Sequence, residues 1–284
     1  MRLVRVGAAG AETPGLLRGS ELVDASGFVR DYDGDFFASG GVAALKAWAD
    51  ERAGSLPLLS AEARIGPPIA RPGKVVCIGL NYSDHAEESG MAVPTEPVVF
   101  MKGSDTVIGP YDDVHIPRNS TKTDYEVELG VVIGSAARYL DSHEAAADVI
   151  AGYCVSHDVS EREFQLERGG QWDKGKSCET FNPLGPWLVT PDEVTDPQAL
   201  ELTLDVNGEA RQRGTTATMI FSVLEVVRYA SQFMVLEPGD LLNTGTPPGV
   251  GMGRTPTAYL RAGDVVDLSV TGLGQQRQRF VPAP

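Results

Sequence analysis

The chain has 284 residues, of which 42% are hydrophobic and 22% are charged, and its formal net charge is −15. A chain of this length can bury a large core without disulfide or metal staples, and its composition excludes wholesale disorder. The negative charge argues against nucleic acid as a partner, but it does not repel metal cations.

The first 66 residues differ from the rest and predict a small N-terminal α+β domain. MRLVRVG and the segment 22–30 are typical of short strands. Residues 41–53 predict a helix, because Leu45, Trp48 and Ala49 fall on one face. The segment GPPIARPGK that follows cannot form a helix. We therefore place a boundary near 65–72, which divides the chain into domains 1–66 and 72–284.

Strand signals multiply from Lys74 onward. VVCIGL is a continuous apolar run, which predicts a strand buried on both faces. PVVFMK, TDYEVELGVVIG and GYCVSHDVS predict further strands, and Asn207-Gly208 predicts a hairpin turn after LELTLDV. Helices are expected at 141–151, with a capping box from Asp141 to Glu144, and at 219–236. This order predicts mixed or antiparallel β topology rather than a doubly wound sheet.

The cysteines and the N-terminus bear on the cellular compartment. The three cysteines form no CxxC pair, and Cys77 and Cys154 lie in apolar runs typical of core residues. Together with an N-terminus that lacks the apolar run of a signal peptide, this favours a reducing cytoplasm. We expect no membrane span, because the longest apolar-looking stretch, 219–236, contains Glu225 and Arg228.

Three carboxylates lie where strands are predicted. Side chains alternate along a strand, so Glu126 and Glu128 share one face and Tyr125 takes the other. Two neighbouring carboxylates on a buried strand need compensation, which a divalent cation can supply. Asp158 follows the next predicted strand and is a candidate third oxygen ligand. The alternatives are a solvated Glu pair and an Asp158 that caps the next helix.

Other polar residues could serve catalysis. His85 and Glu88 are three residues apart in NYSDHAEESG, so on a helix they share a face; the carboxylate would raise the basicity of the imidazole, which could then take a proton from water. The alternative is a surface pair. Lys176, Arg162 and Gln165 could stabilise an anion or lie on solvated faces. The rigid loop from Thr244 to Gly251 suits a carboxylate and matches neither a phosphate-binding nor a dinucleotide-binding fingerprint.

The succession of these motifs resembles the fumarylacetoacetate hydrolase superfamily. It runs CIGLNYSDHAEESG, PVVFMKGSD, DYEVELGVVIG, DVSEREFQ, GKSCETFNPLGPWLV and LEPGDLLNTGTPPGVG. The resemblance implies an α+β, mainly β fold, namely a mixed β-sandwich roll with a small N-terminal α+β domain. It also implies a homodimer with the metal inside the roll.

The resemblance implies a role for each candidate residue. It makes Glu126, Glu128 and Asp158 the ligands of Mg²⁺ or Mn²⁺ (Ca²⁺ being possible in a crystal), His85 and Glu88 the water-activating dyad, Arg162, Gln165 and Lys176 the groups that stabilise negative charge, and Thr246 the residue that holds the substrate carboxylate.

The implied activity is metal-dependent hydrolysis of a C–C bond in a small 2-oxo acid of the acylpyruvate or diketo-acid type. Oxaloacetate decarboxylation, or another lyase or isomerase reaction on small oxo acids, would use the same site and stays open. A non-catalytic metal-binding dimer is a further alternative. The presence of His85, Glu88 and Lys176 argues against it, because binding a metal needs only the carboxylates.

Overall fold

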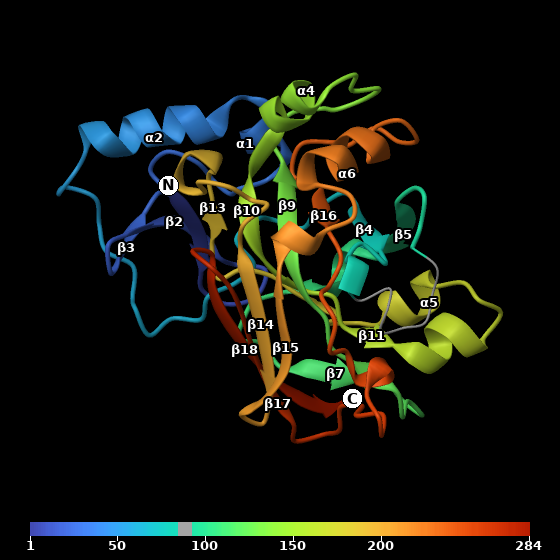
Figure 1. The fold of residues 1–284 in the computed structure, drawn as a ribbon. Helices are drawn as coiled ribbons and strands as arrows, with labels where there is room; N and C mark the ends of the chain where they lie inside the picture. The colour runs from blue at the N-terminus through green and yellow to red at the C-terminus, as the bar shows by residue number, and fades with distance from the viewer. Residues whose placement is uncertain (85–92) are drawn as a thin grey trace.

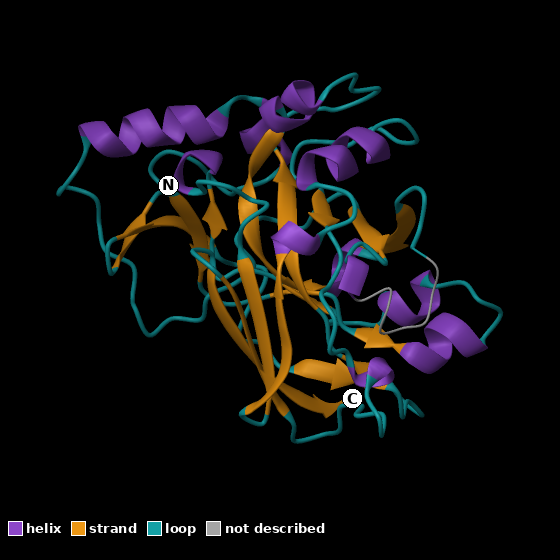
Figure 2. Ribbon diagram, viewed as in Figure 1, coloured by secondary structure: helices purple, strands orange, loops and turns teal. Residues whose placement is uncertain are grey.

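The computed structural model describes residues 1–84 and 93–284, and these are built mostly from strands (Figures 1 and 2). The largest unit is a nine-stranded sheet with both parallel and antiparallel pairs. In spatial order its strands are β3 (Glu21–Asp24), β2 (Thr13–Arg18), β1 (Arg2–Val6), β13 (Leu188–Val189), β10 (Ile150–His157), β9 (Val127–Ile133), β16 (Leu241–Asn243), β4 (Val75–Gly79) and β5 (Val98–Lys102).

A second sheet of five strands packs against this one. Its strands are, in order, β15 (Glu209–Thr215), β14 (Glu201–Val206), β17 (Val265–Val270), β18 (Gly274–Pro282) and β7 (Val114–Ile116). Two short ladders complete the strands: β11 (Ser160–Glu161) with β8 (Thr123–Asp124), and β12 (Asn182–Pro183) with β6 (Val107–Ile108). The predicted mainly β sandwich is confirmed.

Helices are short and lie outside the sheets, as Figure 2 shows. The α-helices are α1 (Gly34–Ala38), α2 (Gly41–Glu51), α4 (His143–Asp148), α5 (Asp173–Lys176) and α6 (Val223–Ala230). Single helical turns of other types are η1 (Ser104–Thr106), η2 (Glu163–Glu167), η3 (Pro191–Glu193), η4 (Thr216–Thr218) and η5 (Gly251–Gly253). Within the described part of the chain, no helix is long and apolar enough to cross a membrane.

The central strands are buried on both faces, which explains their continuous apolar runs. Along β9, Val131 packs into the core between the two sheets, and Val132 packs into a second core that α1 and α2 cover. Along β4, Val76 likewise packs into the core between the sheets, and Cys77 packs into the second core. The strands that carry the predicted carboxylates are therefore held rigidly between two cores.

The strands of the first 66 residues extend the large sheet, because β1 pairs with β13 as well as with β2. The proposed boundary near 65–72 stays a prediction. Cys77 and Cys154 are buried, as expected of core residues.

Several predicted elements need correction. The helix predicted at 141–151 runs only from His143 to Asp148, because the side chain of Ser142, not Asp141, caps it by accepting from the amide of Ala145. Residues from Ile150 onward belong to β10. The strand predicted through TDYEVELGVVIG is interrupted between β8 and β9.

The helix predicted at 219–236 is also shorter and begins at Val223. Asn81 takes the backbone of the preceding residues out of the helix: its carbonyl accepts from the amide of Ile220 and its side-chain oxygen from the amide of Phe221, both at 2.8 Å. The hairpin predicted at Asn207-Gly208 is confirmed, with positive φ at both residues.

Candidate active site and metal centre

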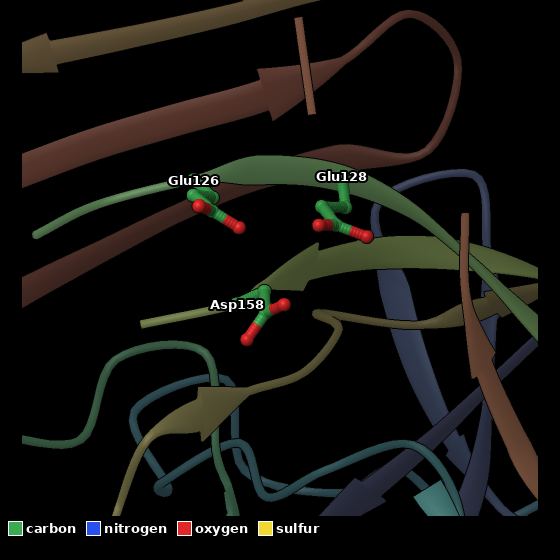
Figure 3. A group of neighbouring side chains, drawn as sticks. All are labelled: Glu126, Glu128 and Asp158. Carbon is green, nitrogen blue, oxygen red and sulfur yellow. The ribbon is translucent and has the colours of Figure 1, made fainter. Parts of the chain in front are cut away.

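Three buried carboxylates converge where β9 begins and β10 ends. Glu126 directly precedes β9, Glu128 lies within it, and Asp158 directly follows β10 (Figure 3). One carboxylate oxygen from each residue lies within 4.8 Å of the others. Because all three side chains are buried, the alternative of a solvated Glu pair is wrong.

The alternation that places two of these carboxylates together holds in the structure. Tyr125, Val127 and Leu129 point into the core between the sheets. Glu126 and Glu128 point the other way and face Asp158 (Figure 3). Antiparallel pairing of β9 with β10, with Ser156 opposite Glu128, fixes the position of Asp158, which comes two residues later.

Cations surround two of the three carboxylates. The ammonium of Lys176 donates to Glu126 Oε2 and Asp158 Oδ2, both at 2.9 Å. Lys102 donates to the other oxygen of Asp158 and to the carbonyl of Val159. Asp158 is therefore held by two lysines, and the alternative in which it caps the following helix is wrong.

Arg162 connects the site to its surroundings. Its guanidinium donates to Glu126 Oε1 at 2.6 Å, to Asp124 Oδ2 at 2.8 Å and to Gln165 Oε1 at 3.0 Å. Burial opposes ionisation of Arg162, but Asp124 and Glu126 outweigh it and hold its pKa above the ordinary value. Burial also opposes ionisation of Lys176, and Asp158 and Glu126 likewise keep its pKa raised. Both side chains are therefore cations within the site, and neither has a solvated position.

Glu128 differs from its neighbours. Its Oε2 accepts from the amide of Gly245 at 2.7 Å, and among the described residues no cation lies within ion-pair distance of it. Burial, and then the charges of Asp158 and Glu126, raise its pKa well above the ordinary value. The ionised form of Glu128 is thus poorly compensated by the protein's own residues, and the metal-free site favours its protonated form.

Glycine at two positions lets the site close. Gly245 has a φ of 100°, and a Cβ there would lie 2.8 Å from Cβ of Asn81, so only glycine brings this amide to Glu128. A Cβ on Gly175 would lie 2.4 Å from the carbonyl oxygen of Glu161. Because Gly175 has no Cβ, α5 can approach closely enough for Lys176 to reach the carboxylates.

Thr246 and Gln165 line the same pocket as the carboxylates. The hydroxyl of Thr246 donates to the carbonyl of Val127 at 2.9 Å and accepts from Gln212 at 2.8 Å. Its side chain therefore fixes the loop after β16 against β9. The assignment of Thr246 to a substrate carboxylate stays a prediction.

His85 and Glu88 lie outside the described residues, so the dyad stays a prediction. The described residues before them are tied to the site, because Asn81 donates to the carbonyl of Thr244 at 2.8 Å, next to the glycine that binds Glu128.

The sequence analysis gave no role to Lys102 or Asp124. Lys102 ends β5 and is fully buried against Asp158. Asp124 is fully buried and accepts from Arg162 and from the amides of Gly251 and Met252. The available signals were that Lys102 ends an apolar strand run and that Asp124 lies two residues before Glu126. Neither reveals its partner, because the partners come from distant segments.

A small pocket of about 90 Å³ opens onto Glu126 and Glu128 of the triad. Its polar lining consists of Glu126, Glu128, Arg162, Gln165, Lys176 and Thr246. Three oxygen donors of this kind suit a hard divalent cation such as Mg²⁺ or Mn²⁺, and the poorly compensated charge on Glu128 fits such an ion. The structure therefore brings together seven of the nine predicted site residues.

Comparisons with known proteins agree with this arrangement. Residues 74–281 match the family model "Fumarylacetoacetate (FAA) hydrolase C-terminal". A protein of Burkholderia multivorans that is named only provisionally as a hydrolase is 53% identical over 280 residues, covering 98% of each chain.

Two solved structures match along the whole of both chains. The 5-carboxymethyl-2-hydroxymuconate delta-isomerase of Mycobacterium smegmatis is 32% identical, with a TM-score of 0.79. The maleylpyruvate hydrolase of Sphingobium sp. SYK-6, solved with manganese(II) and pyruvate, is 25% identical, with a TM-score of 0.83.

Proposed function

The chain belongs to the fumarylacetoacetate hydrolase family, and we propose that it is a divalent-metal-dependent hydrolase that cleaves a C–C bond in a small acylpyruvate-like 2-oxo acid. The observation that carries this proposal is the buried triad of Glu126, Glu128 and Asp158, whose two glutamates line a pocket together with Arg162 and Lys176. A buried carboxylate with a raised pKa, such as Glu128, beside a pocket is typical of active sites.

The residues present fit a bound divalent ion. Glu126, Glu128 and Asp158 would hold it, and Mg²⁺ or Mn²⁺ is the class of ion that three carboxylates favour. The manganese in the Sphingobium maleylpyruvate hydrolase supports this choice. When bound, such an ion supplies Lewis-acid polarisation of the substrate's oxo group.

The protein's own side chains would supply charge and orientation. Lys176 and Arg162 reach the pocket and would stabilise the negative charge that grows on the oxo acid as the C–C bond breaks. Their contacts with Glu126 and Asp158 hold them in place before the substrate arrives. This fixed arrangement would lower the reorganisation needed during the reaction.

Water activation is assigned to His85, oriented by Glu88. The imidazole would take a proton from water, and the resulting hydroxide would attack the carbonyl distal to the 2-oxo group. The bond between the attacked carbon and the pyruvate unit then breaks, releasing a carboxylic acid and the enolate of pyruvate, which takes the proton back from the imidazolium to give pyruvate. This step rests on the family resemblance and on the hydrogen bond from Asn81 to the carbonyl of Thr244, in the loop that follows β16.

A second candidate is an isomerase or decarboxylase of small oxo acids at the same site. The likeness to the Mycobacterium smegmatis delta-isomerase favours it. Isomerisation and decarboxylation both need negative charge stabilised on the oxo acid, but neither needs an attacking water. The two candidates therefore differ in how far they depend on the proposed base.

The test is steady-state turnover of acetylpyruvate and oxaloacetate by the wild type, His85→Ala and Lys176→Ala, with Mn²⁺ content measured in each. We expect His85→Ala to lose about 10²–10⁴-fold of acetylpyruvate hydrolysis, with metal affinity unchanged and any oxaloacetate decarboxylation much less affected. Lys176→Ala should damage both reactions. Full hydrolysis in excess chelator, or in metal-loaded His85→Ala, would contradict the proposal.

The homodimer implied by the family resemblance is part of the same proposal. Light scattering of the purified protein should give a mass near twice that of the 30.2 kDa chain. A monomeric mass at assay concentration would refute it.

A further inference from the structure

The pocket has two chemically different sides. Glu126, Glu128, Arg162 and Lys176 form a charged end, to which the proposed function assigns the oxo-acid head group. The remaining described lining is apolar and comes from separate segments of the chain. It consists of Ile78, Leu80, Phe100, Leu166, Trp172 and Met252, here called the apolar wall.

The apolar wall is packed around two aromatic rings. Phe100 and Trp172 meet edge to face, with ring centroids 5.5 Å apart. Gly79 makes room for the indole, because a Cβ at that position would lie 2.6 Å from Trp172 Cζ3. The wall is therefore a shaped surface within the pocket, built by β4 and the residue after it, β5, η2, the segment before α5, and η5.

Both described cations of the pocket pair with carboxylates of the charged end, and Lys176 Nζ also lies 5.0 Å from the centre of the Phe100 ring. Arg162 contacts Asp124 and Glu126, and Lys176 contacts Glu126 and Asp158. Residues 85–92, which lie outside the described part, contain neither lysine nor arginine. A second carboxylate on the substrate, placed against the apolar wall, would have no described cation to pair with.

We propose that the apolar wall receives the part of the substrate beyond the oxo-acid head, and that it selects an uncharged, apolar acyl tail over a tail ending in a second carboxylate. The inference rests on the proposed function for the position of the head group. Burying an unpaired carboxylate is far costlier than burying a hydrocarbon group, which gains free energy from leaving water. Selection then follows from the unpaired charge as much as from apolar contact.

The test compares two ligands that differ only at the tail. Calorimetry on the Mn²⁺-loaded protein measures the affinities of 6-methyl-2-oxoheptanoate and of 2-oxoadipate, in which a carboxylate replaces the terminal isopropyl group. We expect the alkyl ligand to bind at least about 30-fold more tightly. Pyruvate, which has the head group alone, should bind more weakly than the alkyl ligand. Binding does not require turnover, so the readout is independent of the hydrolase assay.

The outcomes separate this inference from the proposed function. Equal or tighter binding of 2-oxoadipate would overturn the apolar-tail proposal and leave the hydrolase proposal intact. An alkyl ligand that binds no more tightly than pyruvate would do the same. Failure of all three ligands to bind would overturn both.

A charge placed in the wall sharpens the test. Leu166 is 42% exposed at the pocket, so a lysine there can keep its ammonium solvated and still reach a tail carboxylate. Leu166→Lys should reduce the preference for the alkyl ligand by about tenfold. Leu58→Lys is the matched control, because Leu58 is also an exposed leucine but lies outside the pocket. An unchanged preference in Leu166→Lys would contradict the assignment of the wall to the tail.

Discussion

Two clusters of charged side chains in this protein invite comparison. The N-terminal cluster ties the first segment of the chain together through Arg5, Glu12, Asp31, Arg64 and Asp112. The site cluster consists of Lys102, Asp124, Glu126, Glu128, Asp158, Arg162 and Lys176. In each cluster the carboxylates outnumber the cations by one, so formal charge does not distinguish them.

What distinguishes them is where the surplus negative charge lies. In the N-terminal cluster every carboxylate contacts a guanidinium, and Asp31 and Asp112 reach solvent. In the site cluster the carboxylate that lacks a cation among the described residues is Glu128, which is 1% exposed and accepts one backbone amide, so only its ionised form would be uncompensated. The comparison teaches that the location of an uncompensated charge, rather than the number of charges, marks a place where a cation can bind.

The strongest way to break this comparison is to remove the surplus charge. Glu128→Gln keeps the shape of the side chain but should weaken Mn²⁺ binding by about 100-fold or more and abolish turnover. Titration calorimetry measures the affinity. Asp112→Asn, the matched change in the N-terminal cluster, should leave that affinity unchanged. Wild-type Mn²⁺ affinity in Glu128→Gln would show that the triad does not hold the metal.

The next largest effect should come from removing a fully buried cation. Lys102→Met leaves Asp158 with Lys176 alone, and loss of one partner from a buried ion pair costs about 3–5 kcal/mol. Urea denaturation of the metal-free protein measures the change in the free energy of unfolding. Saturating Mn²⁺ should restore part of the loss by binding only the folded state. A change below about 1 kcal/mol would mean that Lys102 is not a structural counter-ion.

The raised pKa of Glu128 predicts a pH dependence of stability. Above the ordinary carboxyl pKa, the folded metal-free protein retains this proton and the unfolded chain does not, so stability should fall as the pH rises through that window. The contribution is at most about 1.4 kcal/mol per pH unit. Comparing the pH dependence of unfolding in wild type and Glu128→Gln isolates it, and Mn²⁺ should flatten the wild-type slope. Identical slopes in the two metal-free proteins would contradict the assignment.

The smallest effect should come from the N-terminal cluster. Asp112 is partly exposed and accepts from Arg64 Nε at 2.7 Å, so Asp112→Asn should cost only about 1 kcal/mol. Thermal or urea unfolding measures it. A loss as large as that of Lys102→Met would remove the contrast between the two clusters.

Local patterns in the sequence predicted much of the fold. The alternation in DYEVELG gave the shared face of Glu126 and Glu128, and continuous apolar runs gave the doubly buried strands β4 and β9. The short strands β6, β7 and β12 went unpredicted, and so did two longer ones. β2 contains Pro14 and Gly15, and β18 turns Gln276 and Gln278 inward instead of apolar side chains. Both buried glutamines donate hydrogen bonds to carbonyls of distant residues. Because the inward-facing side chains are polar, the segment lacks the apolar alternation that predicts a half-buried strand.

The sequence pointed to the three carboxylates and to the cations Arg162 and Lys176, but not to Lys102. The two glutamates could be predicted from their spacing along one strand. The ion pair of Lys102 with Asp158 depends on the order of strands in the large sheet, which local spacing does not reveal. The helix ends were misplaced for a similar reason. Asn81, remote in sequence, binds the backbone of Ile220 and Phe221 and so displaces the start of α6.

The order of strands in the large sheet has a consequence for how the protein folds. β4 ends at Gly79, yet its parallel partner β16 begins at Leu241, and β9 lies on the other side of β16. Pairings between such distant segments form slowly, because closing the long intervening loops costs conformational entropy before the stabilising contacts can form. The amide of Gly245 follows β16 and so reaches Glu128 only after this closure. We therefore expect the carboxylates to stay hydrated through the early stages of folding, with the candidate site among the last parts of the chain to assemble.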